Sequence, residues 1–204
     1  MNMEINPSEY KILIVDDVMS NVLLLKVLLT NEKFAIATAN NGRQALEQVD
    51  KERPDLLLLD VMMPDLSGFE VAQRLKSNPD TADIPIIFLT ALNSTTDIVK
   101  GFQAGASDFI SKPFNKEELI IRVTHQISLV AAKRIILNKT EELQRIIAGR
   151  DKLYSVIAHD LRSPMGSIKM VLNMLMLNLP VEKIGGEMYE LLTMANRTTE
   201  DVFS

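Results

Sequence analysis

The chain has 204 residues, 47% hydrophobic and 24% charged, which is typical of a globular protein with one full core and a smaller helical unit. A formal net charge of −5, without a basic stripe, argues against nucleic acid or an anionic membrane surface as the main partner. With no cysteine, the chain has neither a disulfide framework nor a thiolate metal site. That absence fits a reducing cytosol, so we expect a cytoplasmic protein. Its apolar runs are far shorter than the roughly twenty residues that a membrane-spanning helix needs, so we expect no membrane span.

Short apolar runs alternate with helical patterns along the first part of the chain. We predict five strands, over Lys11–Val15, Phe34–Thr38, Asp55–Leu59, Ile84–Leu89 and Asp108–Ile110. Between them we predict four helices, around Val22–Leu28 and over Gly42–Lys51, Gly68–Lys76 and Thr95–Ala104. Because runs such as Leu56–Leu59 lack polar alternation, the strands should be covered on both faces. The pattern predicts an α/β domain with a five-stranded, doubly wound parallel sheet.

Polar side chains follow the predicted strands at their carboxyl ends, where open α/β sheets bind ligands. They are Asp16, Asp17, Asp60, Thr90 and Lys112. Three converging carboxylates repel one another, which calls for a cation, and oxygen ligands favour Mg²⁺ or a similar hard ion such as Mn²⁺. A carboxylate can attack a phosphoryl group if metal and fixed cations neutralise its oxygens. Each residue alone has an ordinary explanation, as a helix cap or a surface lysine. The set, on the correct strands, favours this chemistry.

Residues 11 to about 125 resemble the receiver domain of two-component response regulators. The motifs are I-L-I-V-D-D, L-L-L-L-D-V-M-M-P-D-L-S-G, I-I-F-L-T-A and D-F-I-S-K-P-F. The resemblance implies a flavodoxin-like receiver fold with Asp60 as the phosphoacceptor. It also implies that Asp17 binds Mg²⁺ directly, Asp16 largely through water and Met62 through its backbone carbonyl.

The same resemblance assigns roles to the residues after the last two strands. It implies that Thr90 hydrogen-bonds the phosphoryl group and that Lys112 forms an ion pair with it. Phe109 resembles the aromatic switch residue whose rotamer follows the position of Thr90. The family also has a cis peptide at the position of Lys112–Pro113.

From Asn115 onward the sequence predicts long helices, with apolar or tolerated residues recurring at spacings of three and four. This seam consists of Ile136, Thr140, Leu143, Ile147, Arg150, Tyr154, Ile157, Leu161, Pro164, Ile168, Val171 and Leu175. Its phase slips near Arg134–Leu137, where the helix after the fifth strand is expected to run into a coiled coil.

The helical pattern stops near Leu179–Pro180 and resumes after Gly185–Gly186, which predicts a helical hairpin. Two hairpins from two chains would bury their seams in a dimeric four-helix bundle, so we expect a homodimer. We therefore predict a receiver domain over 1–125, a coiled-coil linker helix over 126–145 that continues the last receiver helix, and an all-α hairpin over 146–204.

His159 is expected at an exposed position of this hairpin, where a histidine is usually only a polar surface residue. Its neighbours favour chemistry: Asp160 can orient the imidazole and accept its proton, and Ser163 lies one helical turn further on. Pro164 should loosen the helix beyond the site. The stretch His159–Pro164 resembles the H-box of the dimerisation and histidine-phosphotransfer domain of sensor histidine kinases. Ser163 stands where that family commonly has threonine or asparagine.

Together, the two resemblances imply the N-terminal part of a cytosolic hybrid histidine kinase, with Asp60 and His159 as phosphorylation sites. The printed sequence has no segment resembling an ATP-binding domain, so ATP should act only through such a domain in cis or in trans. A partner histidine kinase or response regulator is also expected. Two alternatives stay open: a response regulator whose C-terminal helices only dimerise or dock a partner, and a relay module that passes phosphate between His159 and Asp60.

Overall fold

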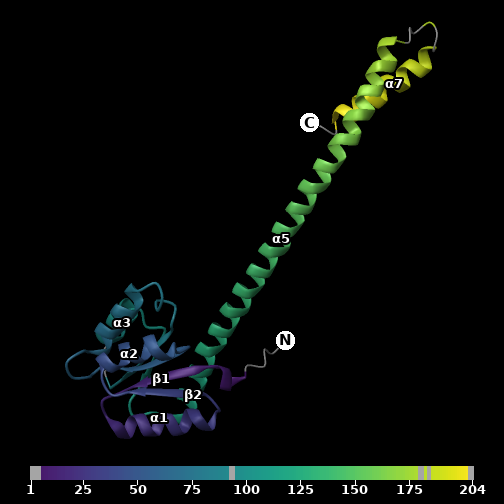
Figure 1. Cartoon of the computed structure of the whole chain (residues 1–204). Coiled ribbons are helices and arrows are strands. Elements are labelled where there is room, and N and C mark those ends of the chain that lie inside the picture. The colour runs from purple at the N-terminus through teal and green to yellow at the C-terminus, as the bar shows by residue number, and fades with distance from the viewer. Residues whose placement is uncertain (1–5, 92–94, 179–181, 183–184, 202–204) are drawn as a thin grey trace. The chain divides into compact units, whose positions relative to one another are not determined.

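The computed structural model describes residues 6–91, 95–178, 182 and 185–201 (Figure 1). The chain divides into two compact units, Met1–Ile136 and Leu137–Ser204. Within the described ranges, no helix combines the length and the apolar character needed to span a bilayer.

The first unit contains a five-stranded sheet in which all paired strands are parallel and the order is β2-β1-β3-β4-β5. Its elements are η1 (Pro7–Glu9), β1 (Lys11–Val15), α1 (Met19–Asn31), β2 (Ala35–Ala39), α2 (Gly42–Glu52), β3 (Leu56–Asp60), α3 (Gly68–Ser77), β4 (Ile86–Thr90), α4 (Thr95–Gln103), β5 (Asp108–Ser111) and the first part of α5 (Lys116–Asn178). The predicted doubly wound α/β sheet is confirmed, with strand ends that differ from the expected ones by at most two residues.

Both faces of the sheet are covered because successive strand residues point to opposite sides. In β1, Leu13 and Val15 belong to one core, together with residues of α2 and α3, whereas Ile12 and Ile14 belong to the other, with residues of α1 and α5. Figure 1 shows α1 on one side of the sheet and α2 and α3 on the other. Because both faces are covered, the strands carry apolar residues at successive positions and show no polar alternation.

The turn after β3 is held by a close backbone approach at Gly68, the first residue of α3. Its N–H donates to the Val61 carbonyl at 3.0 Å. A Cβ atom on Gly68 would lie 2.2 Å from the Asp60 carbonyl oxygen, closer than any side chain can approach. Ser67 and Glu70 form a reciprocal capping box at the start of the same helix. The sequence therefore sets the position of the β3 end through a glycine and a helix cap.

Helix α5 packs on the sheet through Leu119, Val123, Ile127 and Ala131, which are buried. The next turn of α5 carries two cations that bind the amino-terminal side of the sheet. Lys133 forms an ion pair with Asp83 at 2.6 Å, and Arg134 forms one with Asp55 at 2.6 Å. The Arg134 guanidinium also lies 5.4 Å from the centre of the Tyr10 ring. We call Tyr10, Asp55, Asp83, Lys133 and Arg134 the α5 clasp.

Beyond the clasp, the predicted seam of α5 is exposed in the single chain; its large apolar members are Ile136, Leu143, Ile147, Tyr154, Ile157, Leu161, Ile168, Val171 and Leu175. The helix assignment runs without interruption through Pro164. Helix α7 (Gly186–Asp201) follows, and the Asn196 amide donates to Asn173 Oδ1 at 3.0 Å, which joins α7 to α5. A helical pair is thus present in the second unit. Leu179 and Pro180, where we predicted the turn to begin, lie outside the described residues.

Gly68→Ala should destabilise the first unit by about 1–3 kcal/mol, because the new methyl group overlaps the Asp60 carbonyl and the backbone must shift. Urea denaturation followed by circular dichroism measures this loss. Gly149→Ala is the control, since its added Cβ meets nothing within 4 Å and the helix gains propensity. A Gly68→Ala protein as stable as the wild type would contradict the role given to this close approach.

Candidate functional site

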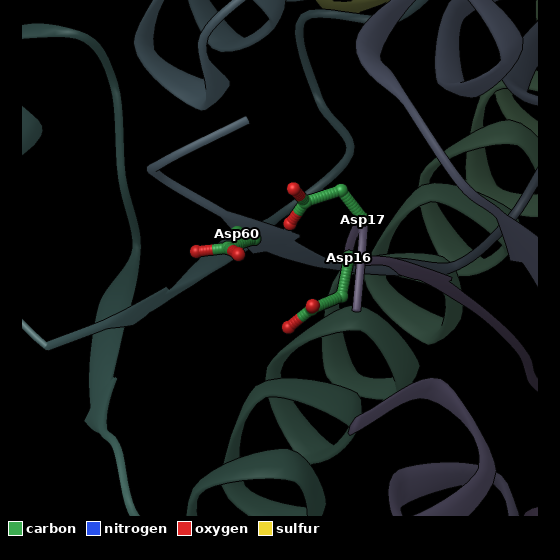
Figure 2. Close-up of side chains that lie close together, drawn as sticks. All are labelled: Asp16, Asp17 and Asp60. Carbon is green, nitrogen blue, oxygen red and sulfur yellow. The ribbon is translucent and has the colours of Figure 1, made fainter. Parts of the chain in front are cut away.

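Three carboxylates lie together at the carboxyl ends of two neighbouring strands. Asp16 and Asp17 follow β1, and Asp60 is the last residue of β3. One oxygen from each lies within 4.8 Å of the others, and Figure 2 shows the three side chains converging. Asp16 and Asp60 are 0% and 3% exposed, whereas Asp17 is exposed. The strand order reverses between β1 and β3, which is where open α/β sheets place ligands.

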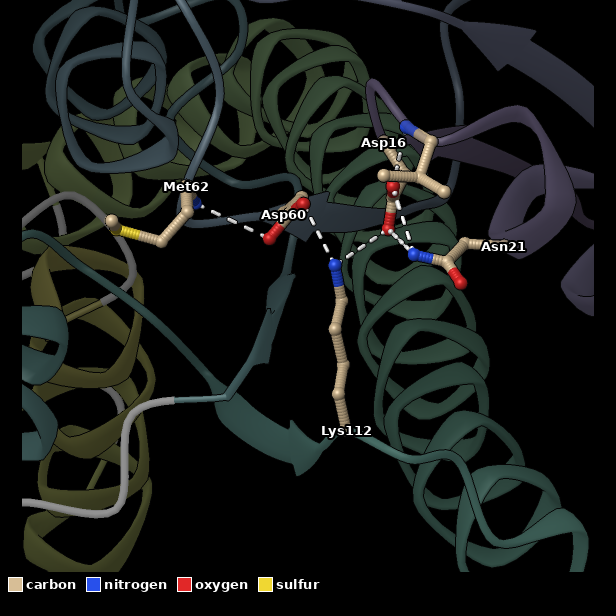
Figure 3. A network of polar contacts seen from close by, with 6 residues as sticks. Asp16, Asn21, Asp60, Met62 and Lys112 are labelled. Atoms are coloured by element: carbon tan, nitrogen blue, oxygen red, sulfur yellow. Dashed lines mark hydrogen bonds and ion pairs between the residues drawn. The ribbon is translucent and has the colours of Figure 1, made fainter.

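Lys112 binds two of these carboxylates at once. Its ammonium donates to Asp16 Oδ2 at 2.8 Å and to Asp60 Oδ2 at 2.7 Å, as Figure 3 shows. The sequence placed Lys112 on this rim but did not predict that it bridges the acids. A buried carboxylate needs a partner charge or several donors, and the bridge supplies one cation to two such groups.

The pKa values of the bridged pair follow from this arrangement. Burial raises the pKa of Asp60 above its usual value, and the hydrogen bond from Lys112 partly offsets that rise. For Lys112, burial by itself lowers the pKa, but the hydrogen bonds to Asp16 and Asp60 and their charges outweigh it and raise the pKa. Lys112 is therefore held as a cation beside a carboxylate that is poorly solvated.

Asp16 receives two further donors that the sequence analysis did not identify. The Val18 N–H donates to Oδ1 at 2.9 Å, and the Asn21 amide donates to Oδ1 at 3.1 Å and Oδ2 at 3.0 Å. Asn21 lies in the first turn of α1. An amide residue in the first turn, directly before the apolar run Val22–Leu25, was the signal that could have drawn attention to it.

The residues at this rim fit a divalent cation with oxygen ligands. Carboxylate oxygens are the ligands that Mg²⁺ prefers, and a cation of charge +2 offsets the repulsion that Lys112 leaves unbalanced among three acids. The Met62 N–H donates to Asp60 Oδ1 at 3.2 Å, so the Met62 backbone lies beside the cluster. The role of the Met62 carbonyl as a ligand stays a prediction.

Thr90 lies on β4, the strand next to β3, and Phe109 lies on β5, the strand beyond it. Thr90 is buried at the end of β4, and its carbonyl accepts from the Lys112 N–H at 2.8 Å. The Lys112–Pro113 peptide is cis, as predicted. The Phe109 ring is partly buried and packs edge-on against Phe102, with 4.8 Å between ring centres. Their roles as switch residues stay predictions.

His159 lies in the second unit, on α5, and its side chain is 83% exposed. Its Nδ1 atom is 3.2 Å from Asp160 Oδ1. Ser163 is exposed on the following turn, and its carbonyl accepts from the Ser167 hydroxyl at 3.2 Å. The acid that was predicted to orient the imidazole is thus within reach of it. The role of these residues in phosphotransfer stays a prediction.

Known proteins similar to this chain are response regulators. The chain is 42% identical over 140 residues to the response regulator PleD of Caulobacter vibrioides. This match covers 69% of this chain and 30% of PleD. It is also 42% identical over 113 residues to the DNA-binding response regulator MtrA of Mycolicibacterium paratuberculosis. This match covers 55% of this chain and 49% of MtrA. The chain thus spans at most about half the length of these relatives.

Solved structures show the same fold. A putative response regulator from Chloroflexus aurantiacus matches with a TM-score of 0.56 and 34% identity over 58% of this chain and 98% of its own. The signal receiver domain of a signal transduction histidine kinase from Syntrophus aciditrophicus matches with a TM-score of 0.55 and 36% identity, over 58% and 90% of the two chains. The family model described as the response regulator receiver domain matches residues 12–124. Since that match covers more than half of the sequence, the chain belongs to the response regulator receiver domain family.

Proposed function

We propose that the first unit accepts a phosphoryl group on Asp60 in an Mg²⁺-dependent step of two-component signalling. The observation that carries this proposal is the bridge from Lys112 to Asp60 and Asp16, with Asp17 beside it. Receiver domains bind Mg²⁺ at an acidic cluster of this kind and interact with histidine kinases or other response regulators. Here Asp16, Asp17, Asp60 and the Met62 carbonyl would hold the ion. When bound, the ion would neutralise charge on the phosphoryl oxygens.

The chemistry of the step follows from the chain's own groups. An oxygen of the Asp60 carboxylate attacks phosphorus, the bond from phosphorus to the donor breaks, and the donor atom leaves with the electron pair and takes a proton from solvent. Lys112 stays protonated because its pKa is raised, and it transfers a hydrogen bond from Asp60 to the phosphoryl oxygens. Thr90 donates its hydroxyl to the same group, and Phe109 follows the position of Thr90.

Asp60→Asn should abolish phosphoryl uptake from acetyl phosphate and Mg²⁺, because the amide keeps the shape of the side chain but is not a nucleophile. Intact-mass spectrometry of the protein measures the uptake directly. Asp65→Asn is the matched control: it is exposed, five residues away, and has a positive φ of 65° that asparagine tolerates. Uptake by the Asp60→Asn protein equal to that of the wild type would refute Asp60 as the acceptor. Chelation of Mg²⁺ should also stop uptake by the wild type.

For the second unit, we propose a homodimeric histidine-phosphotransfer hairpin with His159 as its phosphorylation site, which makes the chain part of a hybrid histidine kinase. The contact between His159 and Asp160 supports an oriented imidazole. The exposed apolar seam of α5 supports a partner, because one hairpin cannot bury it alone. The similar receiver domain from Syntrophus aciditrophicus belongs to a histidine kinase, which supports the pairing of the two functions. ATP would come from an ATP-binding domain in cis or in trans.

With a separate histidine-kinase ATP-binding domain and radiolabelled ATP, the wild-type chain should gain acid-labile phosphate, and His159→Gln should gain none. His125→Gln is the control, since His125 is the other histidine of the chain and lies on the same helix. All three proteins should also carry Asp60→Asn, so that label on the receiver does not obscure the result. Equal labelling of the His159→Gln protein would contradict this site. If none of the proteins is labelled, the result supports the alternative, in which the helices only dimerise the chain or dock a partner.

We further propose that phosphorylation of Asp60 is transmitted to the hairpin through α5 and its clasp. The seam slips in phase near Arg134–Leu137, and the ion pair of Arg134 with Asp55 lies at that place. A small shift of α5 on the sheet would change which of the clasp contacts are made. The clasp is therefore the element through which a change on the receiver would alter the pairing of the helices in a dimer.

Disulfide crosslinking of Leu143→Cys and Ile147→Cys proteins tests this coupling, because the chain has no cysteine of its own. Beryllofluoride, a phosphoryl mimic, should change the relative crosslinking yields of the two positions. The change should disappear in Asp60→Asn and weaken in Arg134→Ala, whereas Lys139→Ala, which removes an exposed ion pair beyond the clasp, should leave it intact. Yields that do not respond to beryllofluoride would rule out coupling through the helix register.

A further inference from the structure

We propose that Asn21 is a positioning residue for the metal and phosphoryl site, acting through Asp16. The proposal rests on the function proposed for Asp60. In this proposal Asn21 itself binds neither the ion nor the phosphoryl group. It would hold the Asp16 carboxylate in a fixed orientation and leave Lys112 able to move.

Asp16 is completely buried, so its negative charge depends on the donors around it. Among the described residues, three groups supply hydrogen bonds to its two oxygens: the Val18 N–H, the Asn21 amide and the Lys112 ammonium. The Asn21 amide is the only one that contacts both oxygens, at 3.1 and 3.0 Å, as Figure 3 shows. It therefore restrains the rotation of the carboxylate, which the Val18 N–H or Lys112 alone does not.

The place of Asn21 in α1 explains how it can do this. Val18, the N-cap of α1, has no side-chain cap bond, and the first turn of the helix has no acidic residue. The Asp16 carboxylate instead accepts from Val18 and from Asn21 in the first turn, and so ties the start of α1 to the end of β1. The orientation of Asp16 and the start of α1 are consequently one structural unit.

The chemistry of asparagine suits a position next to a cation site. A lysine here would add a positive charge that repels Mg²⁺, and an aspartate would add a fourth negative charge beside Asp16. An amide donates hydrogen bonds without carrying a charge. When Lys112 turns to the phosphoryl oxygens, Asp16 keeps the donors from Asn21 and Val18. Without Asn21, Lys112 is the one remaining side-chain donor to Asp16. Asp16 would then retain that lysine and oppose its turn to the phosphoryl oxygens.

Asn21→Leu tests the proposal, because leucine has a similar volume and a high helix propensity but no donor. Titration calorimetry with Mg²⁺ alone, well below the melting temperature, should show about tenfold weaker binding, the loss expected when a group that orients a metal ligand is removed. Asn21→Ala should show the same loss, which protects the test if the leucine protein does not fold. The rate of phosphoryl uptake from acetyl phosphate at saturating Mg²⁺ should also fall, since Lys112 is retained by Asp16.

Asn31→Leu is the matched control, since Asn31 is exposed at the other end of the same helix and should bind Mg²⁺ like the wild type. Mg²⁺ affinity of both Asn21 variants within about twofold of the wild type would overturn the proposal, even if they melt at a lower temperature, because that result indicates a purely structural role. An equal loss in Asn31→Leu would overturn it too. The function proposed for Asp60 fails separately, if the wild type binds Mg²⁺ but takes up no phosphoryl group.

Discussion

The ammonium group of Lys112 between Asp16 and Asp60 is the interaction on which the site depends. Each carboxylate is almost fully buried at the end of its own strand, and two like charges so close together are stable only with a cation between them. The lysine has three N–H groups and uses two of them here. It thus stabilises both acids, and in the proposed phosphoryl transfer it is the cation that would follow the new negative charge on Asp60.

The parallel sheet brings these groups together from distant parts of the sequence. Strands β1, β3 and β5 end on the same rim, so Asp16, Asp60 and Lys112 meet although 96 residues separate the first from the last. The close approach at Gly68 holds the backbone of Asp60, and hydrogen bonds from Val18 and Asn21 hold Asp16. The site therefore lies at the ends of the sheet strands, and Lys112 joins its two buried acids.

Helix α5 joins two environments with different physical character. Up to Ala131 one face of the helix, with Leu119, Val123 and Ile127, is buried against the sheet. The clasp adds two ion pairs and the contact of Arg134 with Tyr10. From Ile136 onward the large apolar residues of its seam are exposed in the single chain. An apolar seam of this length favours association, because its exposure to water is unfavourable. The clasp lies where one environment changes to the other, which is why we place the coupling there.

The sequence by itself determined the class of fold, the five strands, the acidic rim and the run of α5 beyond the sheet. These follow from local patterns: continuous apolar runs, polar residues directly after them, and a three-and-four spacing. It did not determine the bridge by Lys112, the double contact of Asn21 with Asp16, or the clasp of Arg134 on Asp55 and Tyr10. Each of these joins side chains from different elements, and their geometry depends on how helices pack on the sheet. Only the tertiary structure decided them, because a side chain's partners depend on packing and not on its neighbours in sequence.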